Sequence, residues 1–160
     1  MVASFEELRA WQLAAELRDR IVAIAATPVF RQDFRFRDQL TDAACSAPGL
    51  IAEGFGRFGH KEFRRYLTMA RAELLEVQNH LTDLRKRGWL QQVEVDALHD
   101  LADHAVRVTA RLRSYASTSA TRPFTALPTS LAISCLFALR RDSPRKFERN
   151  CPTTDLAISS

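Results

Sequence analysis

Residues 60–87 read HKEFRRYLTMARAELLEVQNHLTDLRKR, and the spacing of the apolar side chains in this stretch decides the fold class. Steps of four and three residues separate the members of one apolar stripe, which are Phe63, Leu67, Ala70, Leu74, Val77, Leu81 and Leu84. Such a repeat predicts a helix that packs lengthwise against other helices. Gly88 follows directly, and glycine readily takes the left-handed conformation that ends many helices. We therefore predict a helix of roughly 42 Å at 1.5 Å per residue.

The residues before this helix predict two more helices. Ser4 begins a Ser-x-x-Glu capping box, so we expect the first helix to begin there and to stop before Pro28, which disfavours helix at the residue it follows. Asp33 is a suitable N-cap for the second helix. Pro48 lies inside that second helix, and because proline lacks a backbone donor we expect a kink or a break in two.

The residues after Gly88 predict a fourth helix over about residues 92–116. Its apolar positions again follow steps of three and four, at Leu98, Leu101, Ala105, Val108, Leu112 and Tyr115. Because the connections between successive helices are short, neighbouring helices are expected to be antiparallel. The prediction is an all-α domain over residues 1–116, an antiparallel up-down four-helix bundle.

Residues 117–160 differ in character from the rest of the chain. Four prolines interrupt any long helix, at Pro123, Pro128, Pro144 and Pro152, and the apolar run LAISCLFAL at 131–139 is shorter than the roughly 20 residues that span a bilayer. Six of the 23 basic residues but only three of the 19 acidic residues lie in this tail. The basic pI is therefore a weak argument for a nucleic-acid partner, and we expect a mostly disordered tail.

The cysteines and the N-terminus bear on the compartment. Cys45, Cys135 and Cys151 are an odd number of widely spaced cysteines without a Cys-x-x-Cys pair, which argues against a disulfide framework and a thiolate zinc site. The first residues, MVASFEELRAWQ, are acidic where an export signal would be basic and then apolar. We expect a cytoplasmic protein without a membrane segment.

Residues 54–59 read GFGRFG, which matches the G-x-G-x-x-G pattern of dinucleotide-binding loops. Such a loop needs a β-strand before it and an acidic residue at the end of a second strand. The residues upstream are typical of a helix, and those downstream belong to the apolar repeat. We therefore interpret the glycines mechanically: Gly54 allows close helix packing, Gly56 ends one helix and Gly59 opens the next.

Four stretches together resemble a known family. They are FEELRAWQLAAEL at 5–17, DQLTDAACSAP at 38–48, IAEGFGR at 51–57 and KEFRRYLTMARAELLEVQNHL at 61–81. The chain resembles bacterial four-helix-bundle proteins encoded in intervening sequences of large-subunit ribosomal RNA genes, which are related to the accessory variability protein of diversity-generating retroelements. The resemblance covers about residues 5–116, and IAEGFGR followed by KEF is its most specific part.

The resemblance implies a non-enzymatic homo-oligomer, a pentameric ring of antiparallel bundles, without a cofactor. The retroelement relatives bind nucleic acid and a reverse transcriptase, so RNA or DNA and a reverse transcriptase are the implied partners. This chain has Gly49-Leu50 where the family usually has Ser-Asn, so no polar role is expected at that turn. The resemblance does not extend to the tail.

One stripe of basic residues is the candidate nucleic-acid-binding site, formed by Arg57, Lys61, Arg64, Arg65 and Arg71. Cations clustered at this density could grip phosphates. The alternative is a solvated face in which Arg57 pairs with Glu53 and Arg71 with Glu76 or with a neighbouring chain. Two further basic groups occur at 85–87, where they suit the end of a helix, and at 107–113.

Phe55, Phe58, Trp89 and Leu90 lie at the two turns that flank the long helix, and they are the candidate oligomer interface. Aromatic residues are enriched between subunits. The alternatives are that they cap the core of their own bundle or, with the least support, that they stack on bases.

Acidic residues and histidines crowd the fourth helix at Asp96, His99, Asp100, Asp103 and His104. A di-iron bundle needs Glu-x-x-His on two helices, and this chain has no Glu-x-x-His, so we expect no metal site. Three hypotheses remain: a nucleic-acid-binding oligomer, acting as accessory factor to a polymerase; an oligomeric protein scaffold; and, with the lowest weight, a metal-dependent bundle enzyme.

Overall fold

The computed structural model describes residues 2–57 and 59–118 of the chain. Within these ranges it contains four α-helices, two short 3₁₀ helices and no β-strand. The elements in chain order are η1 (Phe5–Glu7), α1 (Arg9–Ala25), η2 (Pro28–Gln32), α2 (Phe34–Gly56), α3 (His60–Arg87) and α4 (Gln92–Thr118). The predicted all-α class is confirmed. The predicted tail is residues 117–160; its first two residues belong to α4, and residues 119–160 lie outside the described residues, so the domain boundary stays a prediction.

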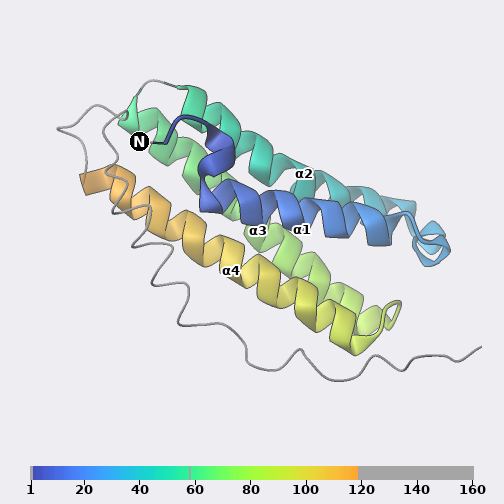
Figure 1. The fold of residues 1–160 in the computed structure, drawn as a ribbon. Coiled ribbons are helices and arrows are strands. Elements are labelled where there is room, and N and C mark those ends of the chain that lie inside the picture. The colour runs from blue at the N-terminus through green and yellow to red at the C-terminus, as the bar shows by residue number, and fades with distance from the viewer. Residues whose placement is uncertain (1, 58, 119–160) are drawn as a thin grey trace, which may run out of the picture. The chain divides into compact units, whose positions relative to one another are not determined.

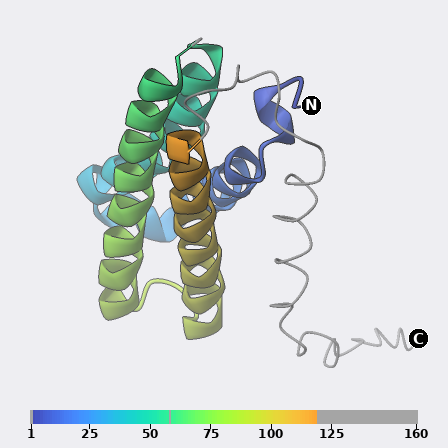
Figure 2. The ribbon, with the colours of Figure 1, turned by 90° about the vertical axis from the view of Figure 1, so that its left-hand side faces the viewer.

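Successive helices run antiparallel and form a four-helix bundle (Figure 1). The main contacts join α1 to α2, α2 to α3, α3 to α4, and α4 back to α1. The α1–α2 pair crosses the α3–α4 pair at an angle (Figure 2). Because successive helices are antiparallel, the connection between α2 and α3 lies at the same end of the bundle as the start of α1 and the end of α4. We call this connection the elbow, and this end of the bundle the elbow end. The α1–α2 and α3–α4 connections lie at the opposite end.

The core consists of the stripe that the sequence predicts on α3 and of matching stripes on the other helices. All seven predicted members on α3 are buried, and Leu67, Leu74 and Leu84 are fully buried. From the other helices, Leu17, Ile21, Leu40, Ile51, Ala102 and Ala105 are fully buried as well. Apolar burial of this kind is the main source of the bundle's stability. None of the described helices is long and apolar enough to cross a membrane.

The start of α1 differs from the prediction. The hydroxyl of Ser4 accepts a hydrogen bond from the backbone of Glu6 and thereby caps the short helix η1, whereas α1 begins only at Arg9. Leu8 has an extended backbone (ψ 119°) and a buried side chain. The expectation of one helix from Ser4 is therefore wrong, because the chain turns at Leu8 to bury that side chain.

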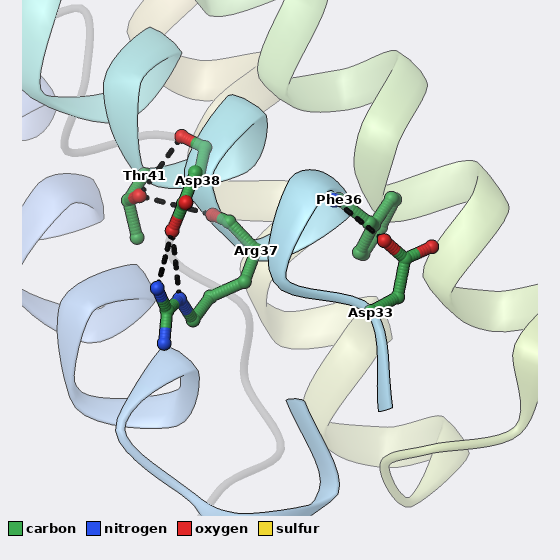
Figure 3. A network of polar contacts seen from close by, with 5 residues as sticks. All are labelled: Asp33, Phe36, Arg37, Asp38 and Thr41. Carbon is green, nitrogen blue, oxygen red and sulfur yellow. Dashed lines mark hydrogen bonds and ion pairs between the residues drawn. The ribbon is translucent and has the colours of Figure 1, made fainter. Parts of the chain in front are cut away.

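The N-cap prediction for α2 is confirmed. The carboxylate of Asp33 accepts a hydrogen bond of 2.9 Å from the backbone N–H of Phe36 (Figure 3). In the next turn, the hydroxyl of Thr41 donates to the carbonyl of Arg37 at 2.9 Å. The helix then continues unbroken through Pro48, so the alternative of a break in two is wrong. Buried residues on both sides of the proline, Ala47 and Ile51, anchor the two halves in the same core.

The glycines at the elbow allow close packing of two helices and mark helix ends, as predicted. Gly54 is buried, and a β-carbon on it would lie 2.6 Å from the β-carbon of Tyr66, so α2 and α3 approach closely only because Gly54 has none. Gly56 ends α2, and Gly59 precedes α3. At the far end of α3, Gly88 takes the predicted left-handed conformation with φ of 65°.

Candidate nucleic-acid interface

The predicted basic residues gather at the elbow end of the bundle. Arg57 is the C-cap of α2, and the other four lie in the first half of α3. Lys61, Arg64 and Arg65 are exposed, and Arg71 is half-buried. The spacing of three and seven residues places Lys61, Arg64 and Arg71 along one side of α3, which we call the α3 stripe.

The positive charge of Arg57 is paired with a carboxylate of its own chain. Its guanidinium forms an ion pair of 2.7 Å with Glu53, and the hydroxyl of Tyr66 donates to the same carboxylate oxygen at 2.7 Å. The guanidinium also lies 5.5 Å from the centre of the Tyr66 ring. The hydrogen bonds from Tyr66 and from Arg57 lower the pKa of Glu53, and the bond to Glu53 raises the pKa of Tyr66. This triad ties the end of α2 to α3.

The remaining basic residues divide into paired and unpaired side chains. Arg65 lies 4.0 Å from Glu62. Among the described residues, Lys61, Arg64 and Arg71 form no side-chain ion pair or hydrogen bond. The predicted alternative that Arg71 pairs with Glu76 is not seen; the carboxylate of Glu76 lies 3.5 Å from Nε2 of His80. The α3 stripe therefore carries three positive charges without a compensating carboxylate.

The opposite end of α3 shows the contrast. All three cations of its last turn form ion pairs: Arg85 with Asp96, Lys86 with Asp83 at 3.4 Å, and Arg87 with Asp33 at 3.0 Å. The pair of Arg85 joins α3 to α4 and that of Arg87 joins α3 to the N-cap of α2, whereas the pair of Lys86 lies within α3. The two ends of α3 thus differ in available charge although both are rich in basic residues.

One residue of the predicted oligomer interface, Trp89, packs against aromatic residues of its own chain. The ring of Trp89 lies 5.4 Å from that of Phe30 and 5.7 Å from that of Phe36, edge to face. The guanidinium of Arg87 lies 4.2 Å from the Phe36 ring and 4.8 Å from the Trp89 ring. Trp89 therefore caps its own bundle, which was the alternative reading of its position.

The structure describes two of the other three predicted interface residues, Phe55 and Leu90. Phe55 lies edge-on to Phe63 with ring centres 6.5 Å apart, and it is half-buried. Leu90 is also half-buried. Phe58 lies outside the described residues. Whether these side chains meet another subunit stays a prediction.

The acidic residues and histidines of α4 do not gather into a metal site. No three His, Cys, Asp or Glu side chains within residues 2–57 and 59–118 could hold one ion. Asp103, one turn from His99, pairs instead with Arg107. Cys45 is an exposed free thiol.

Comparison with known proteins decides the family. A family model described as 23S rRNA-intervening sequence protein matches residues 6–111. The chain belongs to the 23S rRNA-intervening sequence protein family. The match begins at η1 and ends near the close of α4, so this family corresponds to the bundle and not to the tail. No curated protein matches the chain closely enough to count as a relative.

Two contacts between helices were not predicted from the sequence, one at each end of α3. The bond between Tyr66 and Glu53 joins residues 13 positions apart, and only the close approach at Gly54 brings them together. The contact of Arg87 with Asp33 bridges 54 positions. The contact of Tyr66 could have been predicted, because Tyr66 follows the buried Phe63 by one helical turn on the α2 side. No local pattern in the sequence indicated the contact between Arg87 and Asp33.

Proposed function

We propose that this member of the 23S rRNA-intervening sequence protein family is a non-enzymatic, homo-oligomeric, cytoplasmic bundle that binds nucleic acid through the α3 stripe. The observation that carries the proposal is that Lys61, Arg64 and Arg71 form no ion pair with a carboxylate among the described residues. Uncompensated cations on a rigid helix attract phosphates without first breaking an ion pair. Arg57 and Arg65 flank the stripe and are already paired.

RNA is the first partner to test, because the family's description refers to a ribosomal RNA. A pentameric ring would present the stripe five times, and each further contact would then be intramolecular and raise the apparent affinity. In that assembly Phe55, Phe58 and Leu90 are the proposed subunit contacts, with Trp89 in support. An accessory role beside a reverse transcriptase is the more specific form of the proposal.

A second candidate is an oligomeric scaffold that binds only proteins. Two apolar side chains on the outer surface of α3 favour it: Met69 is 42% exposed and Leu75 is 39% exposed. Either side chain could contribute apolar surface to a contact with another protein. The two candidates differ in one respect, which is the retention of nucleic acid.

The test measures binding of a fluorescently labelled single-stranded RNA at several salt concentrations. For Lys61→Gln/Arg64→Gln we expect weaker binding and a salt slope smaller by about 0.7 for each phosphate that is no longer neutralised. The matched control is Arg31→Gln/Arg35→Gln, which removes two exposed cations at the opposite end. Equal RNA binding by wild type and the α3 double variant, with the oligomer intact, would refute the proposal. No RNA binding by wild type would favour the scaffold.

A further inference from the structure

A second group of cations lies where the start of α1 meets the second half of α4, away from the α3 stripe. Arg9 is the first residue of α1, and Arg107 and Arg111 lie on α4; all three are exposed. The two helices are packing neighbours at this end of the bundle (Figure 1). The spacing of three and seven residues places Arg107 and Arg111 on the same side of α4 as His104.

Arg107 and Arg111 share one side of α4 with His104, and Arg9 is the first residue of α1, which packs against α4. Burial lowers the pKa of the His104 imidazole, and the charges of Arg9, Arg107 and Arg111 lower it further, whereas Asp103 acts in the opposite sense. The helical spacing and the packing of α1 on α4 therefore bring the three side chains to the same end of the bundle.

The charges at this place are only partly compensated. Arg107 pairs with Asp103, and Arg9 donates to the amide oxygen of Gln12 at 3.4 Å. Arg111 forms no side-chain ion pair or hydrogen bond within the described part of the chain. The group thus has three cations and one paired carboxylate.

His104 also has an unused hydrogen-bonding atom. Its Nε2 is buried and lacks a hydrogen-bond partner among the described residues. A buried polar atom without a partner costs free energy, so a ligand group that hydrogen-bonds to Nε2 would lower that cost. In a neutral imidazole one ring nitrogen is a donor and the other an acceptor.

We propose that Arg9, Arg107 and Arg111, together with Nε2 of His104, bind a phosphate group. Guanidinium groups match phosphate oxygens through two parallel N–H bonds, and the charge of the anion offsets part of the local positive charge. His104 contributes a neutral N–H donor to one phosphate oxygen. The phosphate comes either from a nucleic-acid backbone or from a free ion. This site is separate from the α3 stripe, and the inference stands without the proposed function.

The experiment follows the imidazole of His104 by NMR in the full-length protein. The pKa of His104 is measured in sodium phosphate and in sodium chloride of equal ionic strength. We expect phosphate to raise it, since a bound anion stabilises the imidazolium among the groups that face it, which are Arg9 of α1 and Asp103, Arg107 and Arg111 of α4. Arg111→Gln should reduce this phosphate-induced rise by at least half. Arg31→Gln, an exposed cation at the opposite end, should leave it unchanged.

A second arm repeats the titration with a single-stranded RNA oligonucleotide in chloride. A rise with RNA alone identifies the backbone as the source of the phosphate, and a rise with both probes shows that the site also takes the free ion. The same pKa in chloride, phosphate and RNA would overturn the proposal. If RNA binding is lost in Lys61→Gln/Arg64→Gln while the pKa of His104 is the same with every probe, the proposed function stands and only this phosphate site is refuted.

Discussion

Tyr66 on α3 stands so close to Gly54 on α2 that a β-carbon built on Gly54 would lie 2.6 Å from the β-carbon of Tyr66. A second neighbour, the ring of Phe63, would lie 3.1 Å away. Neither obstacle is the far end of a flexible side chain. We therefore predict that Gly54→Ala lowers the free energy of unfolding by about 1–3 kcal/mol, because the crowding outweighs the gain in helix propensity. Urea unfolding followed by circular dichroism measures it.

Gly49 supplies the matched control. It lies in the same helix and is exposed, and no other group lies within 4 Å of the position that a β-carbon would take there. Gly49→Ala should raise the free energy of unfolding by about 0.5–1 kcal/mol, as expected for a helix interior. Equal stability of the two alanine variants would show that the helices do not approach closely at the elbow.

The fold could be predicted from the sequence wherever one local pattern dominated. The heptad repeat of α3 identified its buried stripe, and Asp33 and Gly88 marked helix ends because capping depends on neighbouring residues. The start of α1 was missed because a capping box does not reveal that Leu8 must turn into the core. The break at Pro48 was wrong because tertiary packing outweighs the loss of one backbone hydrogen bond.

The candidate site could be predicted only as a set of residues. Helical spacing brought Lys61, Arg64 and Arg71 onto one side of α3, and the pairing of Arg57 with Glu53 followed from their separation of one turn. Which cations remain uncompensated depends on contacts between helices. The cluster around His104 was invisible for the same reason, since Arg9 is far from α4 in the chain.

The triad at the elbow predicts a pH effect. Tyr66→Phe removes the hydrogen bond that lowers the pKa of Glu53 most, so the pKa of Glu53 should rise towards its ordinary value of 4.5 while the ion pair with Arg57 keeps it below. Carboxyl carbon NMR of Glu53 in both proteins checks this. An unchanged pKa would show that the bond between Tyr66 and Glu53 does not form in solution.

The same triad predicts how stability changes with pH. The folded-state pKa of Glu53 is lowered, so its stabilisation is present above the unfolded pKa and is lost as pH falls through the folded value. The pKa of Tyr66 is raised, so its stabilisation is present below the unfolded value of 10.0 and is lost as pH rises through the folded value. The stability difference between wild type and Tyr66→Phe should therefore be largest near neutral pH and narrow on both sides.

The aromatic cluster predicts separate effects for two adjacent residues. Trp89 packs on Phe30 and Phe36, so Trp89→Ala should lower the free energy of unfolding by about 2–4 kcal/mol. Leu90 is half-buried at the same turn, and Leu90→Ser should leave the stability of the single chain nearly unchanged while it reduces the mass of the oligomer. Urea unfolding and light scattering after gel filtration measure the two quantities. An unchanged oligomer in Leu90→Ser would remove this turn from the proposed interface.

The division between paired and unpaired cations yields the sharpest prediction about binding. Arg57→Gln should weaken RNA binding less than Arg64→Gln does, because Arg57 must leave Glu53 before it contacts a phosphate, whereas Arg64 has no such partner among the described residues. Glu53→Gln should act in the opposite direction and strengthen binding. It frees Arg57 and removes a negative charge beside the α3 stripe, so the salt slope should also increase by about 0.7.

Glu94→Gln is the control for Glu53→Gln, because it removes an exposed carboxylate at the opposite end of the bundle and forms no ion pair within the described residues. If both substitutions strengthen RNA binding equally, the effect comes from net charge alone. Only a gain confined to Glu53→Gln, together with the weaker effect of Arg57→Gln, locates the phosphates at the elbow. A salt titration of the four single variants with one labelled RNA decides between these outcomes, since net charge shifts the curves of Glu53→Gln and Glu94→Gln alike, whereas a local contact changes the slope of only one of them.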